Sequence, residues 1–169
     1  MQIIQIVYGV IPSRIARGPE TLRAAFPSAQ YKLIECPAIE DPIQRCIASD
    51  KLRFDLARIY GEQMMYADLD VEVLKSWNIE PGPHFAFRRD QPACFLFYGL
   101  NTRILDWMDE ERKRRHISLD TYCWPAKVLR DNQTVYHIPE DCYKHYEYTR
   151  NANKNEESIR PQGELHEAQ

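Results

Sequence analysis

Apolar positions in the first half of the chain alternate between strand-like runs and helix-like spacing. Short, mostly apolar runs predict strands over Gln2–Tyr8, Gln30–Glu35 and Met64–Ala67. Helices are predicted between them, over Pro19–Phe26 and Ser49–Tyr60. Because strands that alternate with helices usually form a sheet with helices on its faces, we expect an α/β fold with a mixed, mostly parallel sheet flanked by helices.

The predicted helix before the third strand has one apolar stripe. Leu52, Leu56 and Ile59 recur at helical spacing, so we expect them to face the core. Ser49 is a favourable N-cap residue, so this helix is expected to begin there. The preceding segment Asp41–Ala48 starts with Asp-Pro and is expected to form a separate helix or turn.

The second half of the chain continues with strands and one long helix. Strands are predicted over His84–Arg88 and Ala93–Tyr98, and a late strand over Thr134–Ile138. An amphipathic helix is predicted over Asn101–Arg115, with Ile104, Leu105 and Met108 facing inward.

Composition indicates an ordinary globular protein. Of 169 residues, 44% are hydrophobic and 28% are charged, and the net charge of −3 gives no general attraction to nucleic acid or anionic membranes. We expect one domain over residues 1–149 and a polar, disordered tail over residues 150–169. No apolar run approaches the ~20 residues of a membrane span, and the first residues lack the pattern of a secretory signal.

The five cysteines are odd in number and show no Cys-x-x-Cys spacing. Such cysteines are typical of reduced thiols, rather than of a zinc site or a disulfide framework. We therefore expect free thiols and a cytoplasmic location.

Two aspartates one residue apart follow the apolar run Met64–Ala67. If that run is a buried strand, Asp68 and Asp70 emerge on the same side, while Leu69 and Val71 turn back into the core. Divalent cations such as Mg²⁺ are commonly held by one or two carboxylates together with substrate phosphates. The spacing therefore fits a cation site, and it also fits two solvated aspartates near a turn.

A second charged pair lies upstream of these aspartates. Asp50 and Arg53 are three residues apart and share one face of the predicted helix. One interpretation is an ordinary surface ion pair. The other is that the pair lies beside a bound diphosphate, because it is at the start of the predicted helix, where free N–H groups favour anions.

These segments together carry a family resemblance. Ala48–Arg53 with its Ser-Asp-x-x-Arg string, Tyr60–Gly61, and Tyr66–Val71 with its Tyr-x-Asp-x-Asp string resemble the signature of the DXD sugar-binding glycosyltransferases. That family includes capsular polysaccharide sugar transferases, yeast initiating mannosyltransferases and the glucosyltransferase domains of clostridial toxins. The first strand, Ile3–Gly9, is also similar to the family's first strand. The resemblance covers residues 1–75 and implies a GT-A-like fold that binds a nucleotide-sugar.

The resemblance implies which residues bind the donor. Tyr8, which Gly9 follows, would stack on the nucleotide base in place of the family's usual tryptophan, and Tyr66 would lie near the nucleoside. Asp50 would accept hydrogen bonds from sugar hydroxyls, and Arg53 would contact the sugar or the phosphate.

The resemblance also implies a metal centre that holds Mn²⁺ or Mg²⁺. Asp70 would bind the ion directly, and Asp68 would contact the ribose and reach the ion through water. Such transferases often place a further ligand near the C-terminus, where His137 and His145 are candidates. We prefer His145, which lies in an aromatic and polar cluster after the last predicted strand.

The implied activity is metal-dependent transfer of a sugar from a UDP- or GDP-sugar, with retention of anomeric configuration. No carboxylate is placed as a clear nucleophile, so attack from the front face, assisted by the leaving phosphate, is expected. The acceptor is open between a glycan, a protein, a lipid-linked sugar and a modified DNA base.

Two other functions stay open on the sequence. An apolar strand before Asp-x-Asp also resembles the nucleophile loop of haloacid-dehalogenase-type phosphatases, in which Asp68 would be phosphorylated and Asp70 would be the acid/base. However, Glu72 stands where that family has Thr or Val, and its later Gly-Asp pair is missing. The second alternative is a degenerate module that binds nucleotide-sugars without turnover. Only Gly61 of the transferases' Gly-Gly turn is present, and Glu62 follows it.

Overall fold

The computed structural model describes residues 1–10, 17–88, 91–129 and 135–146. Its strands are β1 (Gln2–Tyr8), β2 (Gln30–Cys36), β3 (Met64–Ala67), β4 (Val71–Val73), β5 (His84–Arg88), β6 (Gln91–Tyr98), β7 (Tyr136–His137) and β8 (Tyr143–His145). Six of them form a mixed sheet in the order β2-β1-β3-β6-β5-β7. β1 is parallel to β2 and β3, β6 is antiparallel to β3 and β5, and β7 is parallel to β5. β4 and β8 form a separate antiparallel pair.

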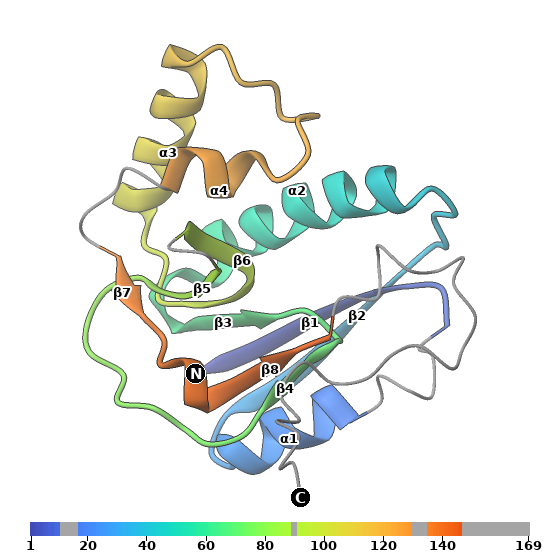
Figure 1. Cartoon of the computed structure of the whole chain (residues 1–169), viewed down its shortest axis with the longest axis vertical. Coiled ribbons are helices and arrows are strands. Elements are labelled where there is room, and N and C mark those ends of the chain that lie inside the picture. Colours follow the sequence, from blue (N-terminus) through green and yellow to red (C-terminus); the bar gives the residue numbers. More distant parts are fainter. Residues whose placement is uncertain (11–16, 89–90, 130–134, 147–169) are drawn as a thin grey trace, which may run out of the picture.

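Helices cover both faces of the sheet. They are α1 (Arg17–Ala25), α2 (Pro42–Tyr60), α3 (Thr102–Arg114) and α4 (Trp124–Leu129), with the short 3₁₀ helices η2 (Gly61–Gln63) and η3 (Glu140–Cys142). Figure 1 shows α2, α3 and α4 on one side of the large sheet, and α1 with the β4–β8 pair on the other. The predicted α/β fold, with a mixed and mostly parallel sheet flanked by helices, is confirmed.

The two central strands contribute to two separate cores, because successive side chains of a strand point to opposite faces. Ile4, Met64 and Tyr66 pack with side chains of α2, α3 and α4. Ile3 and Met65 pack with side chains of α1 and β4. This alternation places Tyr66 beneath the buried face of α2.

α2 begins at Pro42, and not at Ser49 as expected. Asp41 is its N-cap, and the Asp41 carboxylate accepts hydrogen bonds from two backbone N–H groups of the first turn. Proline suits the first helical position, where the missing N–H would have no partner. The segment that was expected to be separate is therefore the first half of α2.

The buried face of α2 also differs from the predicted apolar stripe. Leu56 is buried, but Ile59 is 74% exposed. The buried face includes Asp50 and Arg53 next to Phe54. A charged pair on the inward face interrupts the hydrophobic periodicity, so the pattern alone misplaces this face.

The remaining elements lie close to their predicted bounds. β6 begins at Gln91 rather than Ala93, and α3 begins after the N-cap Asn101, with Leu105 and Met108 buried as expected. β4, β8 and α4 were not predicted. The expected tail lies outside the described residues. None of the helices in the described part of the chain combines the length and apolar character of a bilayer span.

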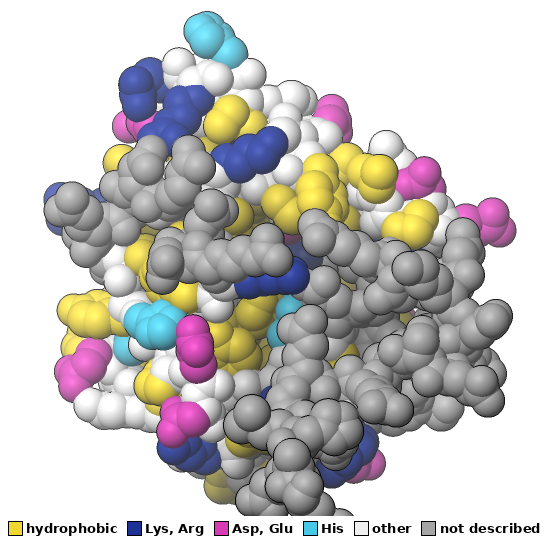
Figure 2. Space-filling view, in the orientation of Figure 1, with side chains coloured by type: hydrophobic (Ala, Val, Ile, Leu, Met, Phe, Trp, Pro, Cys, Tyr) yellow, Lys and Arg dark blue, Asp and Glu magenta, His cyan; other side chains and the backbone are white. Residues whose placement is uncertain are grey.

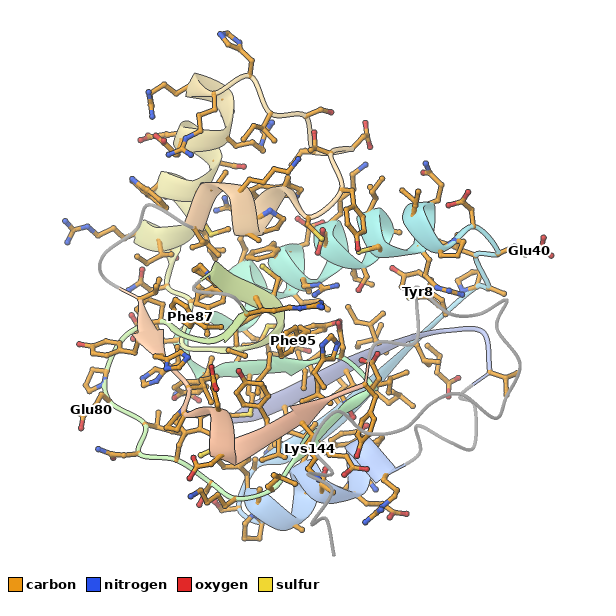
Figure 3. All side chains as sticks on the ribbon, in the orientation of Figure 1. Tyr8, Glu40, Glu80, Phe87, Phe95 and Lys144 are labelled. Carbon is orange, nitrogen blue, oxygen red and sulfur yellow. The ribbon has the colours of Figure 1, made fainter. Side chains whose placement is uncertain are left out.

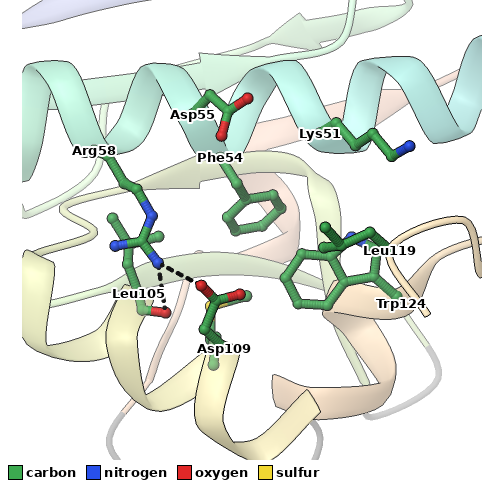
Figure 4. Close-up of a pocket in the computed structure, with 9 residues that line it drawn as sticks. Lys51, Phe54, Asp55, Arg58, Leu105, Asp109, Leu119 and Trp124 are labelled. Atoms are coloured by element: carbon green, nitrogen blue, oxygen red, sulfur yellow. Dashed lines mark hydrogen bonds and ion pairs between the residues drawn. The ribbon is translucent and has the colours of Figure 1, made fainter. Parts of the chain in front are cut away.

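Two surface features involve α3. Figure 2 shows Lys and Arg side chains gathered at the upper left over this helix, whose last turn is basic. Glu111 forms ion pairs with Arg114 and Arg115 there. A pocket of about 190 Å³ lies between α2, α3 and α4, with Phe54 and Trp124 among its lining side chains (Figure 4).

Candidate functional site

The carboxyl ends of two parallel strands meet at one edge of the sheet. β1 ends at Tyr8, and its neighbour β3 ends at Ala67. Asp68 follows directly, and its backbone N–H donates to the carbonyl oxygen of Phe95 on β6 at 2.7 Å. This places the first predicted site residues at the edge where ligands of such sheets commonly bind.

A β-turn, and not strand alternation, brings the two aspartates together. The backbone N–H of Val71 donates to the carbonyl oxygen of Asp68 at 3.1 Å, which closes a turn over Leu69 and Asp70. Val71 is buried as expected, whereas Leu69 is only half-buried. The expectation that both aspartates continue the strand is therefore wrong, although their proximity is confirmed.

The β4–β8 pairing brings His145 next to this turn. The ligating atoms of Asp68, Asp70 and His145 all lie within 4.8 Å of one another, and Nε2 of His145 is 3.5 Å from Oδ1 of Asp70. The imidazole stacks on the ring of Phe95, with centroids 3.9 Å apart and planes inclined by 14°. Figure 3 labels Phe95 close to the end of β8.

These three side chains fit a hard divalent cation. Carboxylates suit both Mg²⁺ and Mn²⁺, and imidazole suits transition-metal ions. Burial raises the pKa of the Asp68 carboxyl, Arg53 opposes this change, and the charge of Asp70 adds to it. A bound cation would relieve the repulsion between the two neighbouring carboxylates.

Arg53 lies at the centre of a buried network. Its side chain is 5% exposed, and it forms ion pairs with Asp50 at 3.4 Å and with Asp68 at 3.5 Å. Its guanidinium also donates to the carbonyl oxygen of Cys94 and to Oγ of Ser49. The Asp50–Arg53 pair is therefore no surface ion pair. It also lies in the middle of α2, so the argument from a helix N-terminus is wrong.

Tyr66 supports this network from the sheet. Its hydroxyl donates to Oδ1 of Asp68 at 2.5 Å and lies 3.3 Å from Oγ of Ser49. The Arg53 guanidinium lies 4.6 Å from the centre of the Tyr66 ring. Tyr66 is 1% exposed, and its polar contacts here are with Asp68, Arg53 and Ser49. Its implied place beside the nucleoside stays a prediction.

Tyr8, labelled in Figure 3, is the last residue of β1, and Gly9 follows it. Burial raises the pKa of the Tyr8 hydroxyl to about 12, so it is protonated at neutral pH. Gly9 has a φ of +82°, and a Cβ there would lie 3.2 Å from Cβ of Ala38. Both the conformation and the space at this position favour glycine.

Asp50 is the most deeply buried of the three aspartates. It is 2% exposed, and its Oδ2 has no hydrogen-bond partner among the described residues. Burial raises the pKa of this carboxyl to about 6, and Arg53 partly offsets the effect. Asp50 thus has a buried acceptor oxygen without a hydrogen-bond partner among the described residues.

Two cysteines adjoin Asp50. The sulfur atoms of Cys46 and Cys123 and a carboxylate oxygen of Asp50 lie within 4.8 Å of one another. The hydrogen bond between the thiols lowers the pKa of Cys123 to about 7 and raises the pKa of Cys46. All five cysteines of the chain are free thiols, as expected.

Several solved structures have a similar arrangement of elements. A crystal structure of the galactosyltransferase LgtC with donor and acceptor sugar analogs aligns with a TM-score of 0.52, at 11% identity, over 82% of this chain and 73% of that one. The PaToxG glycosyltransferase aligns with a TM-score of 0.53, at 12% identity, over 78% and 68% of the two chains. The chain has a GT-A-like glycosyltransferase fold. No protein-family model and no curated protein sequence matches it.

Sequence reasoning missed Gln5, which is buried behind the Asp-x-Asp turn of the GT-A-like sheet. Its Nε2 donates to the carbonyl oxygen of Asp68 at 3.1 Å, and its Oε1 accepts from the Tyr31 hydroxyl at 2.7 Å. A lone glutamine inside an Ile-Gln-Ile-Val run was the available signal, because a buried polar side chain needs hydrogen-bond partners.

The GT-A-like fold also separates the two candidate histidines. His137 is exposed on β7 at the edge of the sheet, edge-on to the ring of Phe87. His145 lies at the site and stacks on Phe95. No sequence signal marked Phe95, since it is far from His145 along the chain.

Asp50→Asn is expected to make the metal-free protein more stable above pH 6. The pKa of Asp50 rises from 3.8 to about 6 on folding, so the wild type loses stability as the pH rises through that window. An amide carries no charge to desolvate, so the variant should gain on the order of 2 kcal/mol at pH 8 and nothing at pH 4. Urea unfolding at the two pH values measures this.

Asp55→Asn is the matched control, because Asp55 is exposed on the same helix. It should change the free energy of unfolding by no more than about 0.5 kcal/mol at either pH. An Asp50→Asn variant that is less stable than the wild type at pH 8 would contradict the raised pKa.

Proposed function

We propose that this protein is a metal-dependent glycosyltransferase that moves a sugar from a UDP- or GDP-sugar to an acceptor, with retention of anomeric configuration. The observation that carries the proposal is the grouping of Asp68, Asp70 and His145 beside the buried Asp50–Arg53 pair, at one edge of a GT-A-like sheet. The likeness to glycosyltransferases favours this function over a phosphatase.

Asp68, Asp70 and His145 would hold Mn²⁺ or Mg²⁺. The bound ion would supply Lewis acidity and positive charge to the departing diphosphate. Gln5 fixes the carbonyl of Asp68, and Phe95 supports the imidazole of His145 by stacking. Such supporting contacts orient the ligands before the ion arrives.

Asp50 and Arg53 would bind the sugar and phosphate part of the donor. Hydrogen bonds fix the Arg53 guanidinium, so its positive charge stays where negative charge grows on the leaving group. The unpartnered Oδ2 of Asp50 would accept a hydrogen bond from a sugar hydroxyl. Tyr8 would stack on the base, and Tyr66 would orient Asp68.

The positions of the carboxylates support retention by attack from the front face. In the described part of the site, Arg53 pairs with both Asp50 and Asp68, and His145 lies beside Asp70. We therefore propose that these carboxylates bind the donor and the ion, and that none of them forms a covalent bond to the sugar. We propose that the acceptor oxygen attacks from the side of the leaving diphosphate, which takes the proton.

The five free thiols fit a reducing compartment, so a cytoplasmic location is part of the proposal. A glycan, a protein, a lipid-linked sugar and a DNA base are each compatible as acceptor. Donor binding and donor hydrolysis can be measured without knowing the acceptor.

UDP- or GDP-sugars are expected to stabilise the protein against heat in the presence of Mn²⁺. A ligand at a hundredfold excess over its Kd adds about 2.7 kcal/mol. For a chain of this size, that raises Tm by roughly 5 to 10 °C. A thermal-shift screen of nucleotide-sugars, with and without Mn²⁺, measures the effect.

Free sugars and nucleoside monophosphates serve as controls and should shift Tm much less, because they lack the diphosphate. Failure of every nucleotide-sugar to raise Tm with Mn²⁺ present would contradict the proposal. A rise in Tm with neither hydrolysis of the donor nor transfer to any acceptor would instead support the inactive binding module.

A further inference from the structure

Cys46, Asp50 and Cys123 form a second group of metal-ligating side chains. Cys46 and Asp50 are four residues apart on α2, so they lie on the same face one turn from each other. Cys123 comes from the segment just before α4 and has a φ of +53°. Helix and segment together bring two sulfur atoms and one carboxylate oxygen within 4.8 Å of one another.

The chemistry of this group differs from that of the Asp68–Asp70–His145 group. Thiolates select soft or borderline ions such as Zn²⁺, whereas Mg²⁺ and Mn²⁺ prefer oxygen ligands. Zn²⁺ binds sulfur at about 2.3 Å, so its ligands must lie close together, and the ligating atoms here are within 4.8 Å of one another. The two thiols are only partly buried, so an ion can reach them from solvent.

Two further observations point to a ligand at this group. Oδ2 of Asp50 is buried without a hydrogen-bond partner among the described residues. Arg53 contacts Asp50 through Nη2 and Asp68 through Nη1, so its guanidinium separates the two groups. Two thiolates and one carboxylate carry three negative charges, which a divalent ion and the Arg53 guanidinium would balance.

We propose that Cys46, Asp50 and Cys123 form a binding site for a thiophilic divalent cation of the zinc class. The site has three protein ligands, and water takes the fourth position. It is distinct from the magnesium or manganese site that the proposed function requires. If that function holds, the ion withdraws Asp50 from the sugar donor, so zinc opposes donor binding.

Cobalt(II) tests the site without any nucleotide-sugar. The reduced full-length protein is titrated with Co²⁺ in excess Mg²⁺, which occupies the oxygen-rich site, and with a reductant that contains no thiol. We expect a thiolate-to-cobalt charge-transfer band in the near ultraviolet that saturates at one equivalent and disappears on addition of Zn²⁺. Cys46→Ser and Cys123→Ser should each weaken cobalt binding at least tenfold, while the matched control Cys36→Ser leaves the band unchanged.

A measurement on the wild type covers the case in which a variant fails to fold. Zn²⁺ should protect Cys46 and Cys123 from alkylation, as measured by mass spectrometry, and leave Cys36 reactive. Absence of the charge-transfer band from the wild type, or a band unchanged in both serine variants, would overturn the proposal. Because no donor is used, this result is independent of the transferase assay.

Discussion

Asp70→Asn is expected to lower metal-dependent donor hydrolysis and sugar transfer at least about a hundredfold, with the fold intact. A neutral amide is a poor ligand for a hard cation, and a metal's stabilisation of a leaving group is worth several kcal/mol. Each ~1.4 kcal/mol corresponds to a factor of ten in rate. The backbone carbonyl of Asp70 still accepts from the N–H of Tyr146 at 2.9 Å, so the turn is retained.

Initial rates over a range of Mn²⁺ concentrations, with the nucleotide-sugar that raises Tm most, measure this effect. Asp106→Asn is the matched control, because Asp106 is a surface carboxylate on α3 paired with Arg58. It should leave the rate unchanged. Equal metal-dependent turnover by Asp70→Asn and the wild type would remove Asp70 from the metal site.

Arg53→Met is expected to lower the free energy of unfolding by about 3 to 5 kcal/mol at pH 7. Without the guanidinium, the buried Asp50 and the partly buried Asp68 lose their counter-charge, and the carbonyl oxygen of Cys94 loses a donor. Donor binding should be lost as well, because the fixed positive charge of the site is gone. Urea unfolding measures the stability, and the thermal-shift screen measures donor binding.

The stability deficit of Arg53→Met should shrink as the pH falls toward about 6, because Arg53 lowers the pKa of Asp50 and the carboxyl of the variant is therefore protonated at a higher pH than that of the wild type. Arg58→Met is the control on the same helix. Arg58 is more exposed, and its ion pairs with Asp106 and Asp109 are at the surface, so this variant should lose no more than about 1 kcal/mol. Equal stability of the two variants would show that the buried charges do not depend on Arg53.

The residues of the proposed metal site could be named from the sequence, but their geometry could not. Asp68 and Asp70 stand out because they follow an apolar run, and a local turn keeps them close. His145 was one of two candidates, and only the β4–β8 pairing places it opposite Val71. Neither short strand has a periodic signal, because three residues are too few to show alternation.

The start of α2 shows how a buried charge misleads pattern analysis. Ser49 has the chemistry of an N-cap, but in the structure its hydroxyl accepts a hydrogen bond from Arg53. Asp41 performs the capping instead. Local propensity is a weak prior here, because the tertiary network that surrounds Arg53 decides which side chain Ser49 meets.

Periodicity and chain order are local properties, so they were enough to predict the α/β class, the main strands and the carboxylates at the ends of those strands. The burial of Arg53 between two carboxylates, the hydrogen bond of Gln5 to the turn and the convergence of Cys46 and Cys123 on Asp50 depend on how the folded chain packs. The contacts of Asp68 with Arg53 and Gln5, and of Cys123 with Asp50, join residues distant along the chain. The packing of the folded chain brings these residues together, and no spacing of residues along the sequence predicts such contacts.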